Sequence, residues 1–577
     1  MQQHKANKFN GELGSIIKNP TEVKSKIQEV MELFTLKKQF SIFNPLKSRG
    51  HEVSKLLGIL VLLPFYGIGN IYNMAKANIA SENKDAYYTI KNNEHIDWRK
   101  LLVLFAKRFR FLINRRDTMK KSGITALIGD DSPLHKTGKK TENISTVHDH
   151  VTNTFILGFK ILVIGYWDGG SFIPIDFSIH REKGSKLQKA KNALKSANKT
   201  LQSTSEKLKK AKASLVKKQV VTAKHRLKVK INPTNTNINN LEKSIASYQK
   251  AKAKVSLLKK ELAKNQSRQR LLKEEQHLIA KKFPEYGLSR KEKKQQFSKN
   301  RANESYGHIR SKETDSSKIT MFITMVKRAV SNGFIPDYVL TDSWFFCQEL
   351  LKTIDKLAKK GVKLLSMVKM GNTIYTLLPN GKTYNAKALL NLYERKASYN
   401  RKIKAKYIKV PVMYYGIRIN LFFVKIGQKG SWRLLVTNDL SLVFIKMMEV
   451  YQLRWSIEVF FKESKQYLNL GKSCSSDFDG QIADATISMI QHIMLTFFKR
   501  MNYQQSFGEL FKTISSEMIE SSLAEKLWEV FMQVIEEFGE ILKLDILEIQ
   551  EQIMRNDKAM LFMKQLIFQK TDLKNVA

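Results

Sequence analysis

The sequence predicts an α/β protein, organised as an α+β multidomain chain with a mixed sheet, flanking helices and helical regions at both ends. Short apolar runs that end in acidic residues, at 124–131 and 337–344, are typical of buried strands. The segment 153–180 holds two β-rich runs around an Asp-Gly-Gly sequence at 168–170, which favours a hairpin turn. Helical patterns separate the later strands, and this interleaved order indicates a mixed α/β sheet.

Length and charge limit the classes of protein to consider. The chain has 577 residues, 42% of them hydrophobic, enough for two to four folded units. It carries 100 Lys+Arg against 52 Asp+Glu, a formal net charge of +48. Such a charge favours a polyanionic partner, above all nucleic acid, although solvated lysine-rich helices would give the same composition.

Cysteine content and hydropathy bear on the compartment. The two cysteines, Cys347 and Cys474, cannot build a disulfide framework, so we expect a reducing, cytoplasmic setting. The longest apolar stretch, 56–69, contains Pro64 and is shorter than the ~20 residues that a membrane span needs. We therefore expect it to form a buried helix and turn, and we expect no membrane partner.

A lysine-rich block at 185–280 differs from its surroundings. It contains 25 Lys+Arg and 5 acidic residues, and leucines recur at every seventh position from Leu187 to Leu215. This heptad pattern breaks at 231–237 and then resumes. The block is predicted to form an antiparallel, coiled-coil helical hairpin. Its basic surface could follow a DNA backbone or be simply a solvated face.

The segment YQLRWSIEVFFKESK at 451–465 is predicted to be one continuous helix. At 100° per residue, four polar side chains share an arc of about 60° beside an apolar arc. Half-buried charges need partners; a phosphate backbone would suit the basic members and a metal ion the glutamate. An isolated Arg-Glu pair four residues apart is usually an ordinary ion pair, whereas the full set is more specific. The set is Tyr451, Arg454, Glu458 and Lys465.

This helix resembles the Y-R-E-K signature of DDE transposases of the insertion-sequence IS-four family. The stretch VYQLRWSIEVFFKESKQYLNLG matches that signature almost throughout, with Val450 in place of the usual leucine. The family also has one acid at the end of the first strand of an RNase H-like fold and another at the end of the fourth. IGDDSPLHKTGKK, with Asp131 before Ser132, and YVLTDSWF, with Asp342, are similar to these two motifs.

The resemblance implies a catalytic set of Asp131, Asp342 and Glu458, which would also be the metal ligands. Two Mg²⁺ ions, replaceable by Mn²⁺, would activate the attacking oxygen and stabilise the leaving one. Asp130 competes for the first role, but neighbours on a strand alternate, so we expect Asp130 to face away. The expected DNA-binding residues are Tyr451, Arg454, Lys465, Lys136, Lys139 and Lys140. Stacking of a base on Trp432 or Trp455 is a further alternative to their burial in the core.

The resemblance covers roughly residues 120–180 and 280–500, and the basic hairpin at 185–280 is not part of the family pattern. We expect a dimer, with the C-terminal helices as its surface, on terminal inverted repeats and target DNA in a bacterial nucleoid. Two rival functions are a non-catalytic nucleic-acid-binding coiled-coil protein and an RNase H-like nuclease that joins no strands.

The expected segments are a helical, DNA-end-binding region at 1–115, the catalytic core at 120–184 and 281–370, the basic hairpin at 185–280, a β-rich insertion at 371–440, core helices at 441–500 and a helical dimerisation region at 501–577.

Overall fold

The computed structural model describes residues 26–519 except 47–49, 78, 81, 117–122, 283, 379 and 502–505, together with residues 534, 552, 555 and 556. The chain divides into two compact units. The larger unit comprises 1–136, 160–180 and 297–577, and the smaller comprises 137–159 and 181–296. Most of the expected dimerisation region, and residues 1–25 of the expected DNA-end-binding region, lie outside the described residues.

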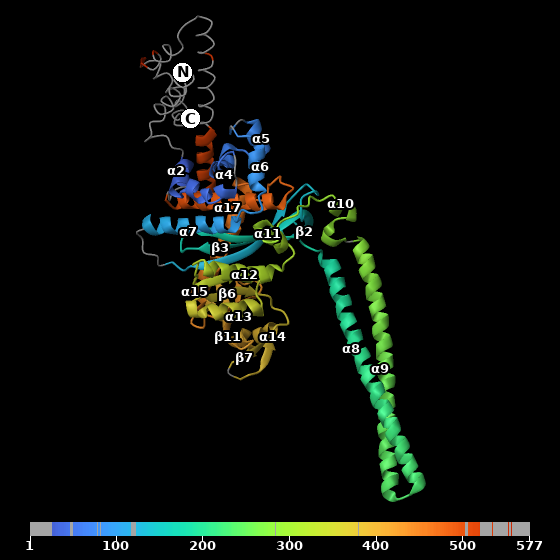
Figure 1. The fold of residues 1–577 in the computed structure, drawn as a ribbon. Coiled ribbons are helices and arrows are strands. Elements are labelled where there is room, and N and C mark those ends of the chain that lie inside the picture. The colour runs from blue at the N-terminus through green and yellow to red at the C-terminus, as the bar shows by residue number, and fades with distance from the viewer. Residues whose placement is uncertain are drawn as a thin grey trace. The chain divides into compact units, whose positions relative to one another are not determined.

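A mixed sheet runs through the larger unit (Figure 1). β1 (Ala126–His135) pairs in parallel with β5 (Tyr338–Thr341), and β5 pairs in parallel with β6 (Lys363–Val368). On the other side of β1 lies β3 (Thr154–Trp167), whose residues 160–167 pair antiparallel with β4 (Phe172–His180). The structure thus places side by side the two strands that the resemblance treats as first and fourth, β1 and β5.

The β-rich segment expected at 371–440 extends this same sheet. β12 (Arg433–Thr437) pairs antiparallel with β6, and the strand order continues β12-β11-β10-β7-β8, with β9 beside β10. The helix α14 (Ala386–Tyr393) follows β8. The other strands of the segment are β7 (Ile374–Leu377), β8 (Thr383–Asn385), β9 (Ser398–Asn400), β10 (Ala405–Tyr414) and β11 (Ile417–Ile426).

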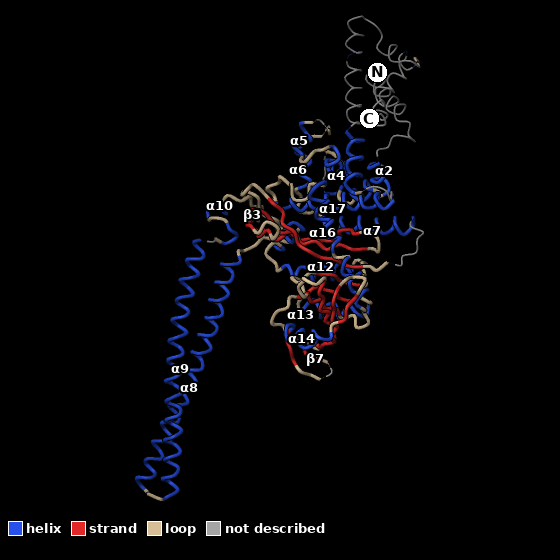
Figure 2. The backbone as a smooth tube through the Cα atoms, turned by 180° about the vertical axis from the view of Figure 1, so that it is seen from behind, coloured by secondary structure: helices blue, strands red, loops and turns tan. Residues whose placement is uncertain are grey.

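Helices cover both faces of the sheet (Figures 1 and 2). α12 (Lys318–Ser331) lies against one face, and α16 (Trp455–Tyr467) and α17 (Phe478–Met501) lie on the other. α17 is buried along most of its length because α7 (Trp98–Arg116) packs against it. Three further helices of this unit are α11 (Tyr306–Glu313), α13 (Gln348–Leu357) and α15 (Phe444–Gln452).

Short helices precede α7. The apolar stretch 56–69 forms most of α4 and a 3₁₀ turn that contains Pro64, and its large side chains are mainly buried, as expected. Among the described residues, no helix is both long and apolar enough to cross a membrane. The helices are α2 (Lys26–Leu33), α3 (Leu36–Ser41), α4 (Val53–Leu62), α5 (Ile71–Lys76) and α6 (Lys84–Lys91).

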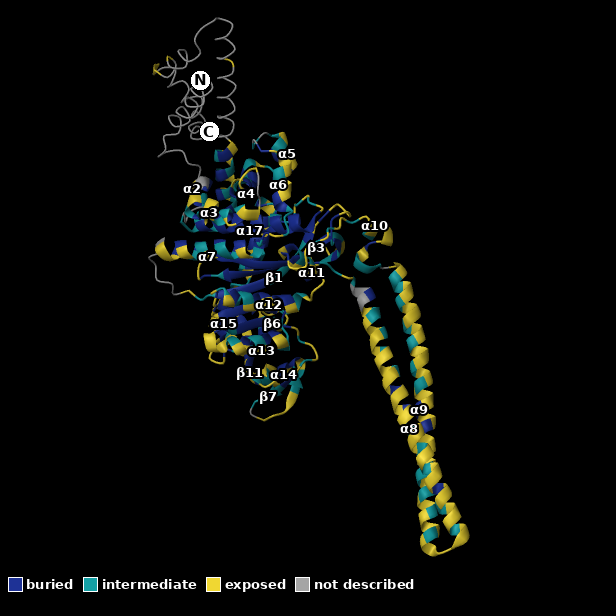
Figure 3. Cartoon of the chain, viewed as in Figure 1, coloured by how far each residue is buried: buried dark blue, intermediate teal, exposed yellow. Residues whose placement is uncertain are grey.

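In the smaller unit, β2 (Ser145–Asp149) pairs antiparallel with residues 154–158 of β3. Two long helices, α8 (Ser185–Ile231) and α9 (Asn235–Lys282), lie side by side, and α10 (Arg290–Lys294) follows them. α8 ends and α9 begins within the break expected at 231–237. Most of their surface is exposed (Figure 3). The apolar seam between them contains Leu208, Val255 and Leu258, with Ala211, Leu215 and Leu262 packed against these.

Candidate active site

Two carboxylates approach each other just beyond the parallel pairing of β1 with β5. The last paired residues are Ile128 and Leu340, and Asp130 and Asp342 each follow them by two positions. Residues at the same level of a parallel pair point to the same face of the sheet. Burial raises the pKa of Asp130 to about 7, and the negative charge of Asp342 is the second cause. The raised pKa of Asp130 therefore agrees with the strand register, because both place Asp130 near Asp342.

Asp131 points to the opposite face, toward α12. Its Oδ2 atom lies 2.8 Å from Lys318 Nζ and 4.0 Å from Lys160 Nζ. Gly129, also on this face, lies so close to α12 that a Cβ there would clash with the ring of Phe322. The orientation expected from the sequence is thus reversed, because the alternation along β1 puts Asp130, and not Asp131, beside Asp342.

The expected continuous helix at 451–465 is interrupted. α15 ends at Gln452 and α16 begins at Trp455, with a tight turn at Leu453 and Arg454. The backbone N–H of Leu453 donates to the carbonyl of Val450 at 3.2 Å, and that of Arg454 donates to Tyr451 at 3.1 Å. These bonds span three residues and not four, so the turn is of the 3₁₀ type.

Arg454 links Asp130 of β1 to Glu458 of α16. Its Nη1 donates to Asp130 Oδ2 at 3.2 Å, and its Nη2 donates to Glu458 Oε1 at 2.5 Å. The Arg454 side chain is only 16% exposed, so these contacts lie in a partly dehydrated setting. The ordinary Arg454–Glu458 ion pair, the alternative to a functional role for the stripe, is thus present, and Arg454 also contacts an acid 324 residues away in the sequence.

The other two members of the helix stripe also reach β1 and β5. The hydroxyl of Tyr451 donates to the carbonyl of Thr341 at 3.4 Å, and burial raises the pKa of Tyr451 to about 12. Lys465 Nζ donates to Ser132 Oγ at 2.7 Å and to the carbonyl of Pro133 at 2.8 Å. The whole stripe therefore lies along the carboxyl ends of the two acid-bearing strands.

The acids fit a divalent cation by their chemistry. Carboxylate oxygens are the ligands that Mg²⁺ prefers. Burial raises the pKa of Asp130, and the negative charge of Asp342 raises it further, so a positive charge nearby would stabilise the ionised acids. Within the described part of the chain, no three His, Cys, Asp or Glu side chains are grouped closely enough to hold a metal ion together. The guanidinium of Arg454, between Asp130 and Glu458, supplies the neutralising charge in this structure.

The three lysines expected to bind DNA after β1 have different surroundings. Lys136 is buried and donates to the carbonyl of Ser473 at 2.8 Å, and burial lowers its pKa to about 8. Lys139 pairs with Glu292 at 2.5 Å, whereas Lys140 is exposed and forms no ion pair with a described residue. Of these three lysines, Lys140 best suits a phosphate contact.

Some residues near the site carried no signal in the sequence. Lys160 and Lys318 come from β3 and from the first turn of α12, and only the fold brings them to Asp131. Trp344 stands in the TDSWF motif itself, so the motif already indicates its proximity to Asp342. Of the two tryptophans considered for stacking, Trp455 is 62% exposed beside Arg454, and Trp432 donates to Glu394.

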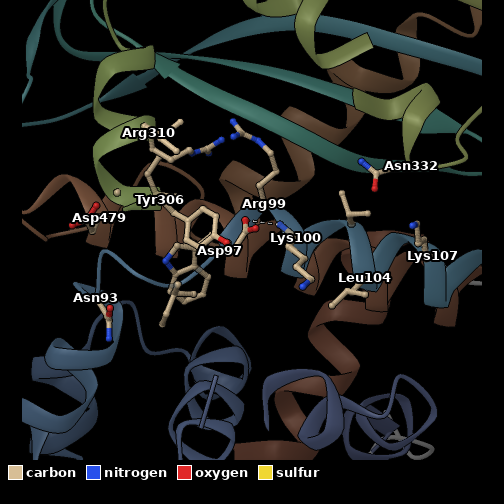
Figure 4. Close-up of a pocket in the computed structure, with 16 residues that line it drawn as sticks. Asn93, Asp97, Arg99, Lys100, Leu104, Lys107, Tyr306, Arg310, Asn332 and Asp479 are labelled. Carbon is tan, nitrogen blue, oxygen red and sulfur yellow. Dashed lines mark hydrogen bonds between the residues drawn. The ribbon is translucent and has the colours of Figure 1, made fainter. Parts of the chain in front are cut away.

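A cavity of about 440 Å³ lies elsewhere in the larger unit, along α7, α11 and α17 (Figure 4). Arg99, on its wall, pairs with Asp176 at 2.8 Å and with Glu313 at 2.9 Å. These contacts join α7, β4 and α11. The cavity wall contains none of the three carboxylates and none of the stripe residues, so it is distinct from the candidate active site.

Comparison with known proteins bears on the same elements. No curated protein matches the chain. A family model described as a transposase DDE domain matches residues 305–493. The matched segment includes Asp342, Glu458 and the whole stripe, and it begins after β1, which carries Asp130. Residues 305–493 are therefore similar to a transposase DDE domain.

Proposed function

We propose that this protein is a DNA transposase in which Asp130, Asp342 and Glu458 form the catalytic carboxylate set. The observation that supports this set is the register of β1 and β5, which makes Asp130 level with Asp342. The transposase DDE domain match includes the other two acids. The set keeps Asp342 and Glu458 from the sequence-based hypothesis and exchanges Asp131 for its neighbour.

The reaction would be phosphoryl transfer on DNA. Two Mg²⁺ ions, or Mn²⁺ in their place, would be held by the three carboxylates and would supply activation of the attacking oxygen and charge for the leaving oxygen. The protein's own contribution is to hold the acids rigidly. Asp130 is fixed by its strand, and Glu458 by the first turn of α16 next to the apolar anchors Ile457 and Phe460, which are buried.

The stripe would bind the DNA backbone at the scissile phosphate. Arg454 has a planar guanidinium that can bind a phosphate in a bidentate way; in the structure it donates one hydrogen bond to each of two carboxylates. Lys465 lies beside Ser132, one residue beyond Asp131, and would add a second positive charge. Tyr451 would orient the site through the carbonyl of Thr341, directly before Asp342.

The substrate would be the terminal inverted repeats of an insertion sequence, followed by target DNA. Cleavage would free a 3′-hydroxyl, and that hydroxyl would then attack the next phosphodiester, by way of a hairpin or directly. A homodimer in a synaptic complex would hold both ends. The N-terminal helices would bind the DNA ends, and the lysine-rich hairpin of α8 and α9, with 25 basic and 5 acidic residues over 185–280, would follow the backbone.

The test is an incubation of the full chain with Mg²⁺ and linear DNA that carries the element's end, with the products mapped on a sequencing gel. Asp130→Asn, Asp342→Asn and Glu458→Gln should each lower cleavage by about 100-fold or more, since even outer-shell partners of a metal site contribute about 10–100-fold. DNA binding should survive. Asp131→Asn is the matched control.

The outcome separates the possible functions. Wild-type cleavage in Asp130→Asn, together with loss in Asp131→Asn, would return the catalytic role to Asp131. Binding without any metal-dependent cleavage would indicate a non-catalytic DNA-binding protein. Cleavage without a joined product would indicate a nuclease.

A further inference from the structure

The cavity along α7 has a wall that is rich in positive charge (Figure 4). Its volume of about 440 Å³ lies within the range of roughly 300–1,000 Å³ that small-molecule sites occupy. Lys100 and Lys107, the rim lysines, are exposed and lie on one side of α7 with Leu104 between them. Two guanidinium groups, those of Arg99 and Arg310, complete the cationic part of the wall.

The two acids on the wall have partners of their own. Asp479 accepts hydrogen bonds from Lys299 Nζ at 2.8 Å and from Arg301 Nε at 3.0 Å. Asp97 Oδ1 accepts from the backbone N–H of Lys100 at 2.9 Å, in the first turn of α7. Since Asp479 is neutralised by residues outside the wall, the cavity keeps an excess of positive charge.

Behind the wall, three guanidinium groups share two carboxylates. Arg99 lies 2.8 Å from Asp176 and 2.9 Å from Glu313. Arg328 lies 2.7 Å from Asp176. Arg310 is farther from both acids, at 3.5 Å from Glu313 and 4.0 Å from Asp176. The group therefore has one positive charge more than it has negative charges, and Arg310 is its most weakly paired member.

Arg310 also has donors that are not used. Its side chain is 5% exposed, its Nη1 donates to the carbonyl of Phe177 at 2.6 Å, and its plane stacks on the ring of Phe177. In the part of the chain that the structure describes, its Nε and Nη2 have no hydrogen-bond partner, and neither has Nε1 of Trp98, another wall residue. Burial, followed by the positive charge of Arg99, lowers the pKa of Arg310 to about 9. Buried donors without acceptors are unfavourable, so an anionic acceptor would stabilise this side of the cavity.

We propose that the cavity binds a nucleoside monophosphate, with its phosphate at Arg310 and Arg99 and its nucleoside against the apolar part of the wall. An ionised phosphate offers acceptors only, fits the planar fork of a guanidinium and carries enough charge for more than one cation. Val103 and Leu104 supply apolar surface for the sugar and base. The ring of Tyr306, also on the wall, is 45% exposed and offers a face on which a base can stack.

The nucleoside monophosphate could be free or could be the phosphorylated end of a DNA strand. The two sources share the chemistry that the cavity recognises, a phosphate joined to a flat, largely apolar body. The site does not rest on the proposed function, because the cavity wall contains none of the catalytic carboxylates.

The experiment is calorimetric titration of the full chain, in EDTA, with AMP and with adenosine. Wild type should bind one AMP per chain, and adenosine about 10- to 150-fold more weakly, the range that follows from hydrogen bonds to charged groups. A chain with a net charge of +48 attracts anions over its whole surface, so the decisive variant leaves the charge unchanged. Val103→Trp fills the cavity and should weaken AMP binding by about 10-fold or more. Tyr72→Trp, at a 61% exposed position on α5, is the matched control and should bind AMP as wild type does.

Two further variants test the phosphate contacts. Arg310→Met leaves two guanidinium groups opposite two carboxylates, so the fold should be retained, and thermal melts check this. It should weaken AMP binding by about 10- to 150-fold and leave adenosine binding unchanged. Lys107→Ala should weaken AMP binding by about 2- to 5-fold, whereas Lys76→Ala, at an exposed position on α5, should not.

A competition experiment identifies the source of the phosphate. A blunt duplex with 5′-phosphates and the same duplex with 5′-hydroxyl ends are each added to the chain loaded with AMP. Displacement of AMP by the phosphorylated duplex alone would support the site with a DNA end as its ligand. Retention of AMP with both duplexes would support the site with a free nucleotide as its ligand.

The site and the proposed function can fail separately. Equal AMP affinity in wild type and Val103→Trp would overturn the site, because the anion would then bind elsewhere on the basic surface. Equal affinity of wild type for AMP and adenosine, or an unchanged AMP affinity in Arg310→Met, would overturn it as well. Loss of AMP binding in Val103→Trp, in a chain whose wild type never cleaves DNA, would support the site and overturn the proposed function.

Discussion

Arg454 donates a hydrogen bond to Asp130 at 3.2 Å, although 324 residues separate the two in the sequence. The same guanidinium binds Glu458. One cation therefore neutralises an acid from the sheet and an acid from the helix, in a place where a divalent ion would do the same. Changes in these charges should therefore alter the pH dependence of stability, the binding of metal ions and the binding of DNA phosphates.

The stability of the metal-free chain should depend on the ionisation of Asp130. Burial and the charge of Asp342 raise its pKa from 3.8 to about 7. Between these values the folded state keeps a proton that the unfolded state loses, so the free energy of unfolding falls as the pH rises from about 4 to 7. Urea denaturation in EDTA should show this fall in wild type and a reduction of it in Asp130→Asn, on the order of 4 kcal/mol. An identical pH profile in both proteins would contradict the assignment.

Divalent metal should stabilise the wild type. A ligand at 100 times its dissociation constant adds about 2.7 kcal/mol to the free energy of unfolding. Mg²⁺ or Mn²⁺ should therefore raise the melting temperature of wild type by a few degrees, and should raise that of Asp130→Asn and Asp342→Asn much less. Asp131→Asn should respond as wild type does. A metal response that survives in Asp342→Asn would place the ion elsewhere.

Arg454→Lys should be a severe change despite its equal charge. Lysine has a compact ammonium and cannot reach two carboxylates with a planar fork. We expect DNA cleavage to fall by about 10-fold or more, and the free energy of unfolding to fall by about 1–3 kcal/mol as a partly buried acid loses its donor. Cleavage rates and urea midpoints check this. Lys462→Arg, at an exposed position of the same helix, serves as the control and should change neither quantity.

Removal of the lysine-rich hairpin should change the salt dependence of DNA binding. Replacing residues 188–279 with a short Gly/Ser linker removes most of the basic excess of this block. If α8 and α9 bind phosphates, the slope of log affinity against log salt should flatten by about 0.9 for each phosphate that they neutralise. Cleavage at low salt should persist because the carboxylates lie in the other unit. An unchanged slope would instead indicate a protein-binding role.

The lysines after β1 should differ in their effect on DNA binding. Lys140→Ala should lower the salt slope by about one, because Lys140 is exposed. Lys136→Met should leave the slope unchanged, since Lys136 is buried and bonded to Ser473. Salt titrations of both variants test this. The opposite pattern would mean that Lys136 becomes exposed when DNA binds.

The limits of the sequence are clearest at the adjacent acids. The run before Asp130 and Asp131 is apolar at every position from 126 to 128, and all three residues are buried in the structure. Such a strand has both faces covered, so its sequence has no polar alternation to show which face each residue takes. The sequence-based prediction placed Asp131 beside Asp342 and turned Asp130 away, whereas the contacts in the structure place Asp130 there and Asp131 against Lys318.

Other features followed from local patterns. The heptad pattern and its break predict the bounds of α8 and α9 to within a few residues, because a coiled-coil seam depends only on residues in neighbouring helical turns. The turn at Leu453 and Arg454 was missed because neither residue is a helix breaker. Tertiary contacts hold this turn, including those of Arg454 with Asp130 and of Tyr451 with Thr341.

The two ends of the lysine-rich hairpin return to one place. Lys191, near the start of α8, lies 3.2 Å from Glu285, which follows α9, and Arg181 stacks on Tyr286 with 4.2 Å between guanidinium carbon and ring centroid. An insertion with joined ends can be lengthened, shortened or exchanged at little cost to the host fold. A reporter domain could therefore be inserted at the tip, residues 232–234, without altering the strands that position Asp130 and Asp342.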